Sequence, residues 1–312
     1  EDLDEMRAQQ EGESVKGYWG KWAKCRNLSY EQIKANIADG KSWTLRLKSP
    51  GDTEKKCYFD DMIKGKIEMP ENVQDVVLLK SDGIPTYHFA HAIDDHLMRT
   101  THVIRGDEWI SSTPIHLQLF RVLGFKPPKF AHVAPIMKEE NGGKRKLSKR
   151  KDPEAAVTYY SEVGFPKESV NEYMLTLANS NFEDWRRVNK DESLDKFPFN
   201  LKKMSVSGAL FDIVKLTDVS KNVISKMSAE QVFDLSYEWA KEYDSDLAKL
   251  YEQDKDRAKA ILNIDRENKK PRKDIAKWSD IGEWLSYMYN ETFVPDYELS
   301  GNATPALAVK VL

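Results

Sequence analysis

The sequence predicts an α/β layer followed by an all-helical region. Across residues 76–124 the pattern is strand, helix, strand, helix, an order typical of a sheet with parallel strands. From residue 223 onward the apolar residues recur at the spacing of three and four that helices produce. A chain of 312 residues is long enough for about two domains.

Four short signals in order predict the α/β layer. They are a strand at 76–79 with a turn at 81–83, a helix over 85–98, a strand at 101–104, and a helix that Thr113 caps, Pro114 opens and Gly124 closes. In such sheets ligands bind at the carboxyl ends of the strands. We therefore expect a site at Arg105, Asp107, Glu108 and Trp109, which directly follow the second strand.

Outside that layer the sequence predicts one more strand and six helices. The strand is expected at 44–47 and the helices at 154–163, 170–177, 223–227, 229–243, 247–262 and 275–289. A basic turn at 269–273 lies between the last two helices, and we interpret it as a solvated loop rather than a phosphate contact.

A basic run, Lys-Arg-Lys-Leu-Ser-Lys-Arg-Lys, fills residues 144–151 and follows the pair Gly142-Gly143, in a segment predicted to be a loop. Six of its eight residues are cationic, so they repel one another unless an anion lies between them. Lysine ammonium groups suit phosphates, which makes a nucleotide triphosphate the first candidate. Taken alone, such a run is more often a solvated face, an import signal or a loose nucleic-acid patch.

Residues 146–150, Lys-Leu-Ser-Lys-Arg, resemble the KMSKS signature of class I aminoacyl-tRNA synthetases, in the KLSKR form of the glutamyl-tRNA synthetase subgroup. Residues 85–98 and 102–114 resemble the second half of the catalytic domain in bacterial-type glutamyl-tRNA synthetases. Further matches in the same order are found at 59–67, 130–136 and 204–212. Together the matches cover residues 57 to about 216, so we identify the chain as a member of this family.

The resemblance implies four regions. They are a partial connective insertion that binds the tRNA acceptor end at 1–75, the second half of a Rossmann-type nucleotide-binding domain at 76–124, a stem-contact region carrying the KLSKR loop at 125–222, and part of a helical anticodon-binding region at 223–312. None of the six histidines begins a His-x-Gly-His, the family's second ATP-binding motif. We expect an internal fragment that lacks the half with this motif and does not aminoacylate tRNA alone.

The resemblance also implies the activity of a glutamate–tRNA ligase. ATP, with Mg²⁺ as part of that substrate, would activate L-glutamate to glutamyl-adenylate, and the glutamyl group would pass to the 3′ end of tRNA(Glu). A monomer in the cytoplasm is expected. Two alternatives stay open: a non-discriminating enzyme that also charges tRNA(Gln), and a tRNA-binding module without catalysis. The helical residues 223–312 argue against a short paralogue that modifies another acceptor.

The resemblance assigns roles to ten residues. Lys149 would contact phosphate in the transition state, with Lys146 and Ser148 shaping the loop. The ATP-binding residues would be Lys146, Lys149, Arg150, Glu108, Trp109 and Ile136, and the amino-acid-binding residues Tyr87, His91 and Arg105. Some relatives carry Asn where this chain has His91.

Each role has a plainer alternative. Lys149 could be a surface charge, Tyr87 or Trp109 a core aromatic, and Arg105 the partner of Asp94, Asp95 or Glu108 in a structural ion pair. A metal site is a weak alternative for the polar residues His88, His91, Asp94, Asp95 and His96.

Composition excludes few functions. Cys25 and Cys57 are too few for an all-cysteine zinc site, so no zinc is expected. No run of about eighteen apolar residues occurs, and no membrane partner is expected. The net charge of −3 does not argue against RNA binding, because the basic residues cluster locally.

Overall fold

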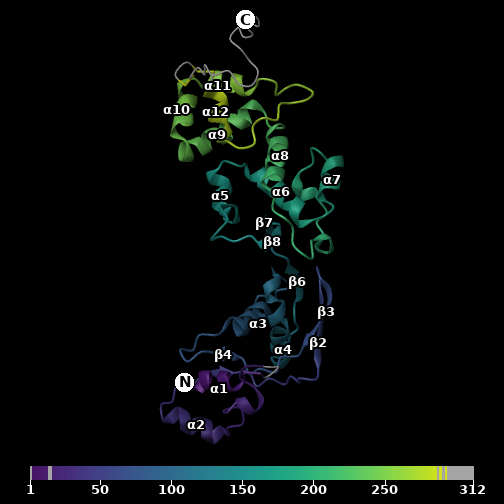
Figure 1. Cartoon of the computed structure of the whole chain (residues 1–312), viewed down its shortest axis with the longest axis vertical. Helices are drawn as coiled ribbons and strands as arrows, with labels where there is room; N and C mark the ends of the chain where they lie inside the picture. The colour runs from purple at the N-terminus through teal and green to yellow at the C-terminus, as the bar shows by residue number, and fades with distance from the viewer. Residues whose placement is uncertain (1, 13–15, 287, 290–291, 294–312) are drawn as a thin grey trace, which may run out of the picture. The chain divides into compact units, whose positions relative to one another are not determined.

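The computed structural model describes residues 2–12, 16–286, 288–289 and 292–293 (Figure 1). The chain divides into two compact units, which are described separately. The first comprises Glu1–Pro135 and Pro198–Gly208, and the second comprises Ile136–Phe197 and Ala209–Leu312.

The first unit contains one four-stranded sheet, one two-stranded sheet, and helices that lie before, between and after the strands along the chain. Its helices are α1 (Asp2–Gln9), η1 (Gly20–Trp22), α2 (Tyr30–Ala38), α3 (Tyr87–Leu97), η2 (Asp107–Ser112), α4 (Thr113–Val122) and η5 (Leu201–Lys203). Its strands are β1 (Leu45–Arg46), β2 (Lys56–Asp61), β3 (Gly65–Pro70), β4 (Val77–Leu79), β5 (His102–Gly106) and β6 (Lys129–Val133).

The larger sheet is mixed and has the order β3-β2-β6-β5. Strands β2 and β3 form an antiparallel hairpin, whereas β6 runs parallel to both β2 and β5. The predicted parallel layer therefore exists, but one of its predicted strands was wrong. The segment at 76–79 forms β4, which pairs antiparallel with β1 instead of joining the parallel strands. The parallel partner of β5 is β6, which the helix α4 precedes in the sequence.

The two helices α3 and α4 pack together over an apolar cluster. Its buried members are Leu47, Leu78, Ala92, Leu119 and Phe120. Helix α4 begins one residue earlier than predicted, so Ser112 occupies the N-cap position and makes no side-chain capping bond. Thr113 is thus not the cap; its hydroxyl donates to the carbonyl of Trp109 instead. Gly124 follows the helix with φ +72°, the left-handed conformation that glycine adopts without strain.

The four regions predicted from the sequence stay a prediction, but one of their boundaries separates elements that pair. A boundary after residue 124 lies between β5 and β6, which are hydrogen-bonded from His102↔Lys129 to Gly106↔Val133. The first unit accordingly extends to Pro135.

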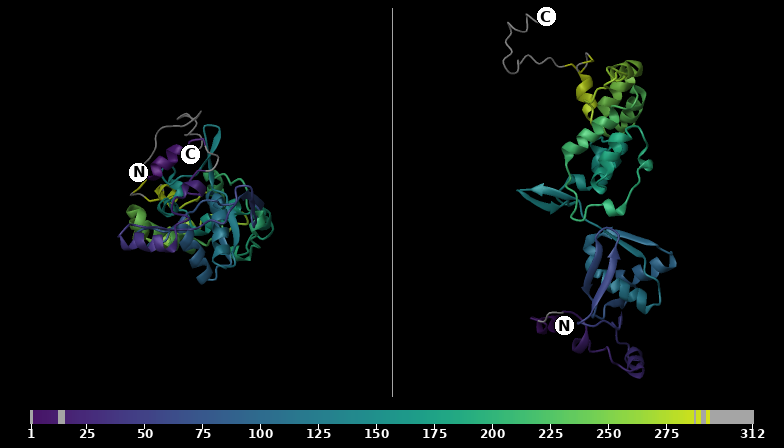
Figure 2. Two further views of the ribbon diagram at one scale, coloured as in Figure 1. Left: turned by 90° about the horizontal axis from the view of Figure 1, so that it is seen from below. Right: turned by 90° about the vertical axis from the view of Figure 1, so that its right-hand side faces the viewer.

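The second unit is a β-hairpin followed by helices. Its strands are β7 (Met137–Glu140) and β8 (Gly143–Lys146), and its helices are η3 (Pro153–Ala155), α5 (Val157–Glu162), α6 (Lys167–Ala178), α7 (Phe182–Val188), η4 (Leu194–Lys196), α8 (Ile213–Ile224), α9 (Ala229–Tyr243), α10 (Ser245–Gln253), α11 (Lys255–Leu262) and α12 (Asp280–Ser286). Figure 2 shows the hairpin standing out from the helices of this unit.

Helices form at most of the predicted positions in this unit, but several of them differ from the predicted length. Helices α6 and α9 match the predictions at 170–177 and 229–243, whereas the first predicted helix is split into η3 and α5. The segment at 223–227 holds only the end of α8, and the predicted helix at 247–262 is broken into α10 and α11. Asp254 breaks it, because its backbone is extended and its side chain accepts from the Arg257 N–H to start α11. Within the last predicted helix, at 275–289, the described residues are helical only in α12.

Helices α9, α10, α11 and α12 enclose an apolar cluster that includes Val232, Tyr251, Leu262 and Ile281, each fully or almost fully buried. Figure 1 shows these helices gathered at one end of their unit. Within the described residues, no helix is both long enough and apolar enough to cross a membrane.

Candidate active site

Arg105 lies near the carboxyl end of β5, where the parallel register sets it opposite His132 of β6. Its Nε donates to His132 Nε2 at 3.0 Å, and one terminal nitrogen lies 2.9 Å from His116 Nδ1 on α4. The other terminal nitrogen donates to the Thr113 hydroxyl at 3.0 Å and approaches the Trp109 carbonyl at 3.5 Å. The guanidinium also lies 5.0 Å above the ring of Phe130, which suits a cation–π contact.

No carboxylate pairs with Arg105 among the residues that the structure describes. The alternative of an ion pair with Asp94, Asp95 or Glu108 was therefore wrong: the acceptors of its hydrogen bonds are two imidazoles, the Thr113 hydroxyl and a carbonyl. A partly buried cation without a paired carboxylate is stabilised when an anionic ligand binds to it. This is the electrostatic arrangement expected where a substrate carboxylate binds.

The imidazoles around Arg105 are held neutral. Burial lowers the pKa of His88, His91 and His132 below the usual value of histidine, and burial among these neighbours lowers the pKa of His116 to about 2. His116 and His132 are completely buried, so their charged forms would lose their hydration, and for His132 this loss outweighs the hydrogen bond to Asp61. At neutral pH Arg105 thus carries the positive charge of this cluster.

Tyr87 and His91, both on α3, and Trp109, on η2, complete this side of the site. The ring of Tyr87 lies 4.4 Å from that of Trp109 and stacks on His91 at 5.8 Å, measured between centroids. Tyr87 is 49% exposed, so it is not the core aromatic of the alternative reading. The phenol is also close enough to Arg105 to stabilise its positive charge. The three predicted amino-acid-binding residues, Tyr87, His91 and Arg105, therefore lie together.

His91 has an unused polar atom. Its Nδ1 lies 2.8 Å from Asp95 and its side chain is only 7% exposed, yet its Nε2 has no hydrogen-bond partner within the described part of the chain. A buried ring nitrogen without a partner is costly and is expected to bond with a ligand. The Nε2 of His91 is therefore available for the predicted contact with the amino acid.

Glu108, a predicted ATP-binding residue, lies against the backbone of Gly106. A Cβ added at Gly106 would meet the Glu108 carboxylate at 2.3 Å, so only glycine allows this approach. Lys64 reaches the neighbouring Asp107 at 3.1 Å and thereby links the β2–β3 turn to η2. Among the described residues no group of three or more His, Cys, Asp or Glu could hold a metal ion, and His88 of the alternative metal site is bonded to His116 at 2.9 Å.

The basic run is not the simple loop that its glycines predicted. Lys144, Arg145 and Lys146 belong to strand β8, and the hairpin turn is formed by Asn141 and Gly142, which have φ +52° and +77°. Such a turn needs two positive φ values, for which Asn-Gly is the preferred pair. The loop itself is shorter and follows β8, beginning with Leu147, whose N–H donates to the Ile136 carbonyl at 2.8 Å.

Asp152, which the sequence analysis missed, holds this loop. Its carboxylate accepts from both terminal nitrogens of Arg145, from the Ser148 N–H at 2.9 Å and from Lys138 at 3.3 Å. The hydrogen bond from Arg145 and other favourable contacts outweigh desolvation and hold the pKa of Asp152 well below its usual range. The sequence does contain a signal for this role. Asp152 is a single carboxylate directly after a run of cations, and such a run is expected to need an anion.

Lys149 and Arg150 are exposed, and neither makes an ion pair or a hydrogen bond through its side chain within the described residues. Ser148 is partly buried and fixed by its N–H, so the residue before Lys149 has a defined position. Lys146 is exposed at the end of β8. Ile136, in contrast, packs against the apolar cluster around Tyr160 and Phe211. The KLSKR residues and Ile136 thus lie together within the second unit, apart in sequence from the Arg105 group.

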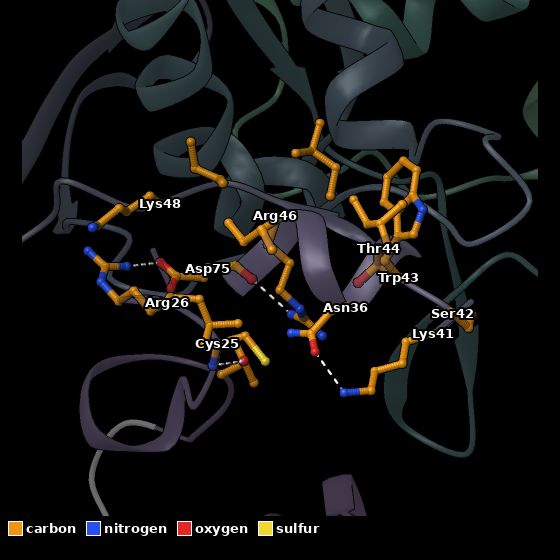
Figure 3. Close-up of a pocket in the computed structure, with 16 residues that line it drawn as sticks. Cys25, Arg26, Asn36, Lys41, Ser42, Trp43, Thr44, Arg46, Lys48 and Asp75 are labelled. Atoms are coloured by element: carbon orange, nitrogen blue, oxygen red, sulfur yellow. Dashed lines mark hydrogen bonds and ion pairs between the residues drawn. The ribbon is translucent and has the colours of Figure 1, made fainter. Parts of the chain in front are cut away.

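A cavity of about 580 Å³ lies in the first unit between α2 and the segment around β1 (Figure 3). Ile33 and Ile37 of α2 line it together with Trp43, which is 51% exposed. No pattern in the sequence indicates this cavity, because its lining joins residues from separate segments of the chain.

The lining of this cavity has an excess of positive charge. The cations are Arg26, Lys41, Arg46 and Lys48, and the one carboxylate is Asp75. Asp75 is buried and pairs with Arg26, while Arg46 stacks over Tyr18 at 4.1 Å and donates to the backbone carbonyl of Asp75 at 2.9 Å. Lys41 donates to the Asn36 amide at 2.7 Å (Figure 3). Three of the four cations therefore have no carboxylate partner among the described residues.

Comparison with known proteins places these features in a family. A sequence profile described as tRNA synthetases class I (E and Q), catalytic domain, matches residues 1–218. Glutamate–tRNA ligase of Clostridium perfringens (strain 13 / Type A) is 54% identical over 294 residues, covering 94% of this chain and 54% of the relative. Glutamate–tRNA ligase of Acetivibrio thermocellus is 48% identical over 313 residues, covering 100% of this chain and 57% of the relative.

A solved structure agrees with the sequence relatives. The glutamate tRNA ligase from Elizabethkingia meningosepticum, in complex with its amino acid, is 27% identical with a TM-score of 0.72, covering 91% of this chain and 58% of that chain. The chain spans about half the length of the curated relatives it matches. With its mixed sheet, its helices and a profile match over most of its length, the chain belongs to the class I tRNA synthetases of the glutamate and glutamine group.

Proposed function

We propose that this chain provides the glutamate-facing and phosphate-facing parts of a glutamate–tRNA ligase. The observation that carries the proposal is Arg105, a partly buried guanidinium whose hydrogen-bond acceptors are all neutral. Its planar fork suits a carboxylate, and the unused Nε2 of His91 supports a second polar contact to the same amino acid. Tyr87 supplies the exposed wall of this pocket.

The chemistry needs no nucleophile from the protein. The α-carboxylate of glutamate attacks the α-phosphorus of ATP, and pyrophosphate leaves with the bond electrons. A hydroxyl of the terminal ribose of tRNA then attacks the activated carbonyl, and AMP leaves. Mg²⁺ would arrive with ATP and neutralise phosphate charge. Catalysis is therefore positioning and charge stabilisation, which are the terms that Arg105 and Lys149 can supply.

Lys149 is proposed as the phosphate contact, with Arg150 beside it and Lys146 and Ser148 shaping the loop. Its exposure and lack of an ion pair support this role, because a cation already paired with a carboxylate would gain less from a phosphate. Glu108 and Trp109 are proposed to line the ATP and amino-acid pockets. Ile136 supports the loop through its carbonyl rather than through an exposed side chain.

The partner proposed for the cavity between α2 and β1 is the acceptor end of tRNA. Unpaired cations suit its phosphates, and the exposed Trp43 suits stacking on an unpaired base. The regions at 125–222 and 223–312 are proposed as the stem-contact and anticodon-binding regions. We propose that the whole enzyme acts as a monomer in the cytoplasm, on tRNA(Glu) and, in the alternative, on tRNA(Gln) as well.

Exchange of pyrophosphate into ATP by the full-length protein tests the proposal. Exchange is expected with glutamate when tRNA(Glu) is present, and not with aspartate or glutamine. Arg105→Lys should raise KM for glutamate, because lysine cannot reproduce the planar fork. Exchange that is indifferent to the amino acid would contradict the proposal. Binding of tRNA without any exchange would favour the alternative of a tRNA-binding module.

A further inference from the structure

The hydrogen bonds of Arg105 fix where the protons lie on the histidines around it. Arginine has five N–H donors and no acceptor, so every atom bonded to it must accept. Nδ1 of His116 and Nε2 of His132, at 2.9 Å and 3.0 Å from the guanidinium nitrogens, therefore carry no proton. Each imidazole must be neutral, with its hydrogen on the opposite nitrogen.

On the β6 side, the remaining hydrogen of His132 is on Nδ1, which donates to Asp61 Oδ2 at 2.7 Å. Both side chains are completely buried. Asp61 is itself fixed, because it also accepts from the backbone N–H groups of Ile63 and Lys64, at 3.0 Å and 2.9 Å. These bonds, with those from His132, outweigh burial and hold the pKa of Asp61 below its usual range. Asp61 is thus linked to Arg105 through the neutral ring of His132.

On the α4 side, the remaining hydrogen of His116 is on Nε2, which lies 2.9 Å from His88 Nδ1. His88 accepts this hydrogen bond, so its own hydrogen is on Nε2. Helix α4 presents Thr113 and His116 one turn apart, and both bond to the same guanidinium. Arg105 is consequently held in one plane by β6 and α4 together.

One side of the guanidinium remains open to a ligand. Thr113, His116 and His132 are completely buried, whereas Tyr87, which lies close enough to interact with the charge of Arg105, is 49% exposed. A carboxylate therefore reaches Arg105 from the side of Tyr87, and the buried acceptors hold the fork from behind.

We propose that His116 and His132 are positioning residues for the carboxylate of glutamate, and that they act through Arg105 by presenting unprotonated ring nitrogens to it. The inference rests on the proposed function, since it assigns the orientation of Arg105 in that same pocket. Neither histidine touches the substrate.

The charged and titratable groups that face this cluster agree with such a role. They are His88, His91 and Asp95 on α3, Tyr87 at its start, Asp61 at the end of β2, and Lys64 in the following turn. Protonation of His116 or His132 would remove an acceptor and place a second cation about 3 Å from Arg105. A carboxylate or a lysine in their place would compete with the substrate or repel the fork, so neutral acceptors are the side chains that leave Arg105 available.

The test measures KM for glutamate and for ATP in pyrophosphate exchange by the full-length protein. His116→Leu and His132→Leu should raise KM for glutamate about tenfold or more while KM for ATP changes about twofold or less, because only the fork is misplaced. His116→Asn keeps an acceptor near the position of Nδ1, and His132→Gln keeps one near that of Nε2. These two variants should recover most of the loss. His96→Asn is the matched control, since His96 stacks on Phe125 and lies outside this network.

The outcomes separate the two proposals. If Arg105→Lys raises KM for glutamate but both Leu variants leave it unchanged, the positioning role is wrong and the proposed function stands. If Arg105→Lys also has no effect, the assignment of the amino-acid pocket is wrong. Equal losses for glutamate and ATP without recovery by Asn or Gln indicate a merely structural role and overturn the inference.

Long-range ¹H–¹⁵N spectra of the wild-type protein provide a second test that does not depend on any variant folding. They should show hydrogen on Nδ1 of His132 and on Nε2 of His116. The opposite tautomer, or a doubly protonated ring at neutral pH, would overturn the inference.

Discussion

The carboxylate of Asp152 lies 2.6 Å and 2.8 Å from the two terminal nitrogens of Arg145, and this bidentate pair closes the KLSKR loop onto strand β8. The same carboxylate accepts the Ser148 N–H at 2.9 Å, so the loop on either side of Lys149 is anchored at one point. A side chain that is 1% exposed and makes these contacts is part of the loop's architecture.

Replacing Asp152 with Asn should loosen the loop. The amide loses the charge that attracts Arg145 and Lys138, and it cannot accept on both of its atoms. We expect trypsin to cleave after Lys149 and Arg150 about tenfold faster and kcat for exchange to fall about tenfold, because a mobile loop misplaces Lys149. Limited proteolysis followed by mass spectrometry measures the first effect.

Glu140→Gln is the matched control, because Glu140 also pairs with Arg145 at 2.7 Å but is exposed. It should change neither rate appreciably. The lowered pKa of Asp152 determines how its contribution to stability changes with pH. This stabilisation is present above the usual pKa of an aspartate and is lost as pH falls through the lowered value. Equal cleavage of the wild type and Asp152→Asn at neutral pH would contradict the role of this pair.

Lys149→Met should reduce kcat by about 10²- to 10³-fold, the effect expected when one preorganised charge on a reacting phosphate is lost. Thermal stability should stay within about 0.5 kcal/mol of the wild type, because an exposed lysine without an ion pair contributes little to folding. Steady-state exchange kinetics and thermal unfolding measure the two quantities.

Lys144→Met provides the control for charge alone. Lys144 is exposed on β8, two residues before Lys146, and makes no side-chain hydrogen bond or ion pair within the described residues. If the two Met variants lose activity equally, the loop attracts phosphate only through its total charge, and no special role belongs to Lys149.

The sequence predicted the grouping of three site residues better than the sheet that carries one of them. Tyr87, His91 and Arg105 were named from motif order, and the structure brings them together. The pairing of β4 with β1 was not predicted, because a short apolar run has the same pattern in either type of sheet. His116 and His132 were also missed as partners of Arg105, since only the β5–β6 register and the face of α4 bring them there.

The KLSKR loop was likewise only partly predictable from the sequence. Charge in 144–151 was evident, and the expectation that an anion lies among these cations was reasonable. Asp152 provides one such anion, and its position depends on a local turn from Ser148 to Asp152 that has no clear pattern in the sequence. The break between α10 and α11 is likewise caused by one extended residue, Asp254, inside an otherwise helical pattern.

The low pKa of His116 predicts how stability changes with pH. The folded protein keeps His116 neutral down to about pH 2, whereas the unfolded chain binds a proton near pH 6.5. The unfolded state therefore binds more protons as pH falls, and stability is lost on acidification. Between pH 7.5 and 5.0 this one group should remove about 2 kcal/mol of the free energy of unfolding.

His116→Asn should flatten that dependence by the same amount, because asparagine does not titrate. Urea unfolding of the wild type and the variant across this pH range measures the difference. Parallel curves for the two proteins would show that His116 is not held neutral by its burial against His88, His91 and Arg105.

Trp43→Ala should weaken the binding of tRNA without altering KM for glutamate. Trp43 is 51% exposed at the cavity beside α2, where stacking on a base contributes about 1–3 kcal/mol, so Kd should rise about 5- to 160-fold. Tyr58→Ala is the matched control, since Tyr58 is 68% exposed on β2 and does not line the cavity.

Lys41→Met tests the charge of the same cavity. If its ammonium contacts a phosphate, the variant should bind tRNA more weakly and the slope of log Kd against log salt should fall by about one. Its present partner is only the neutral Asn36 amide, so the ammonium can turn to a phosphate at little cost. Should Trp43→Ala and Tyr58→Ala have equal effects and Lys41→Met leave the salt slope unchanged, the acceptor end binds elsewhere on the protein.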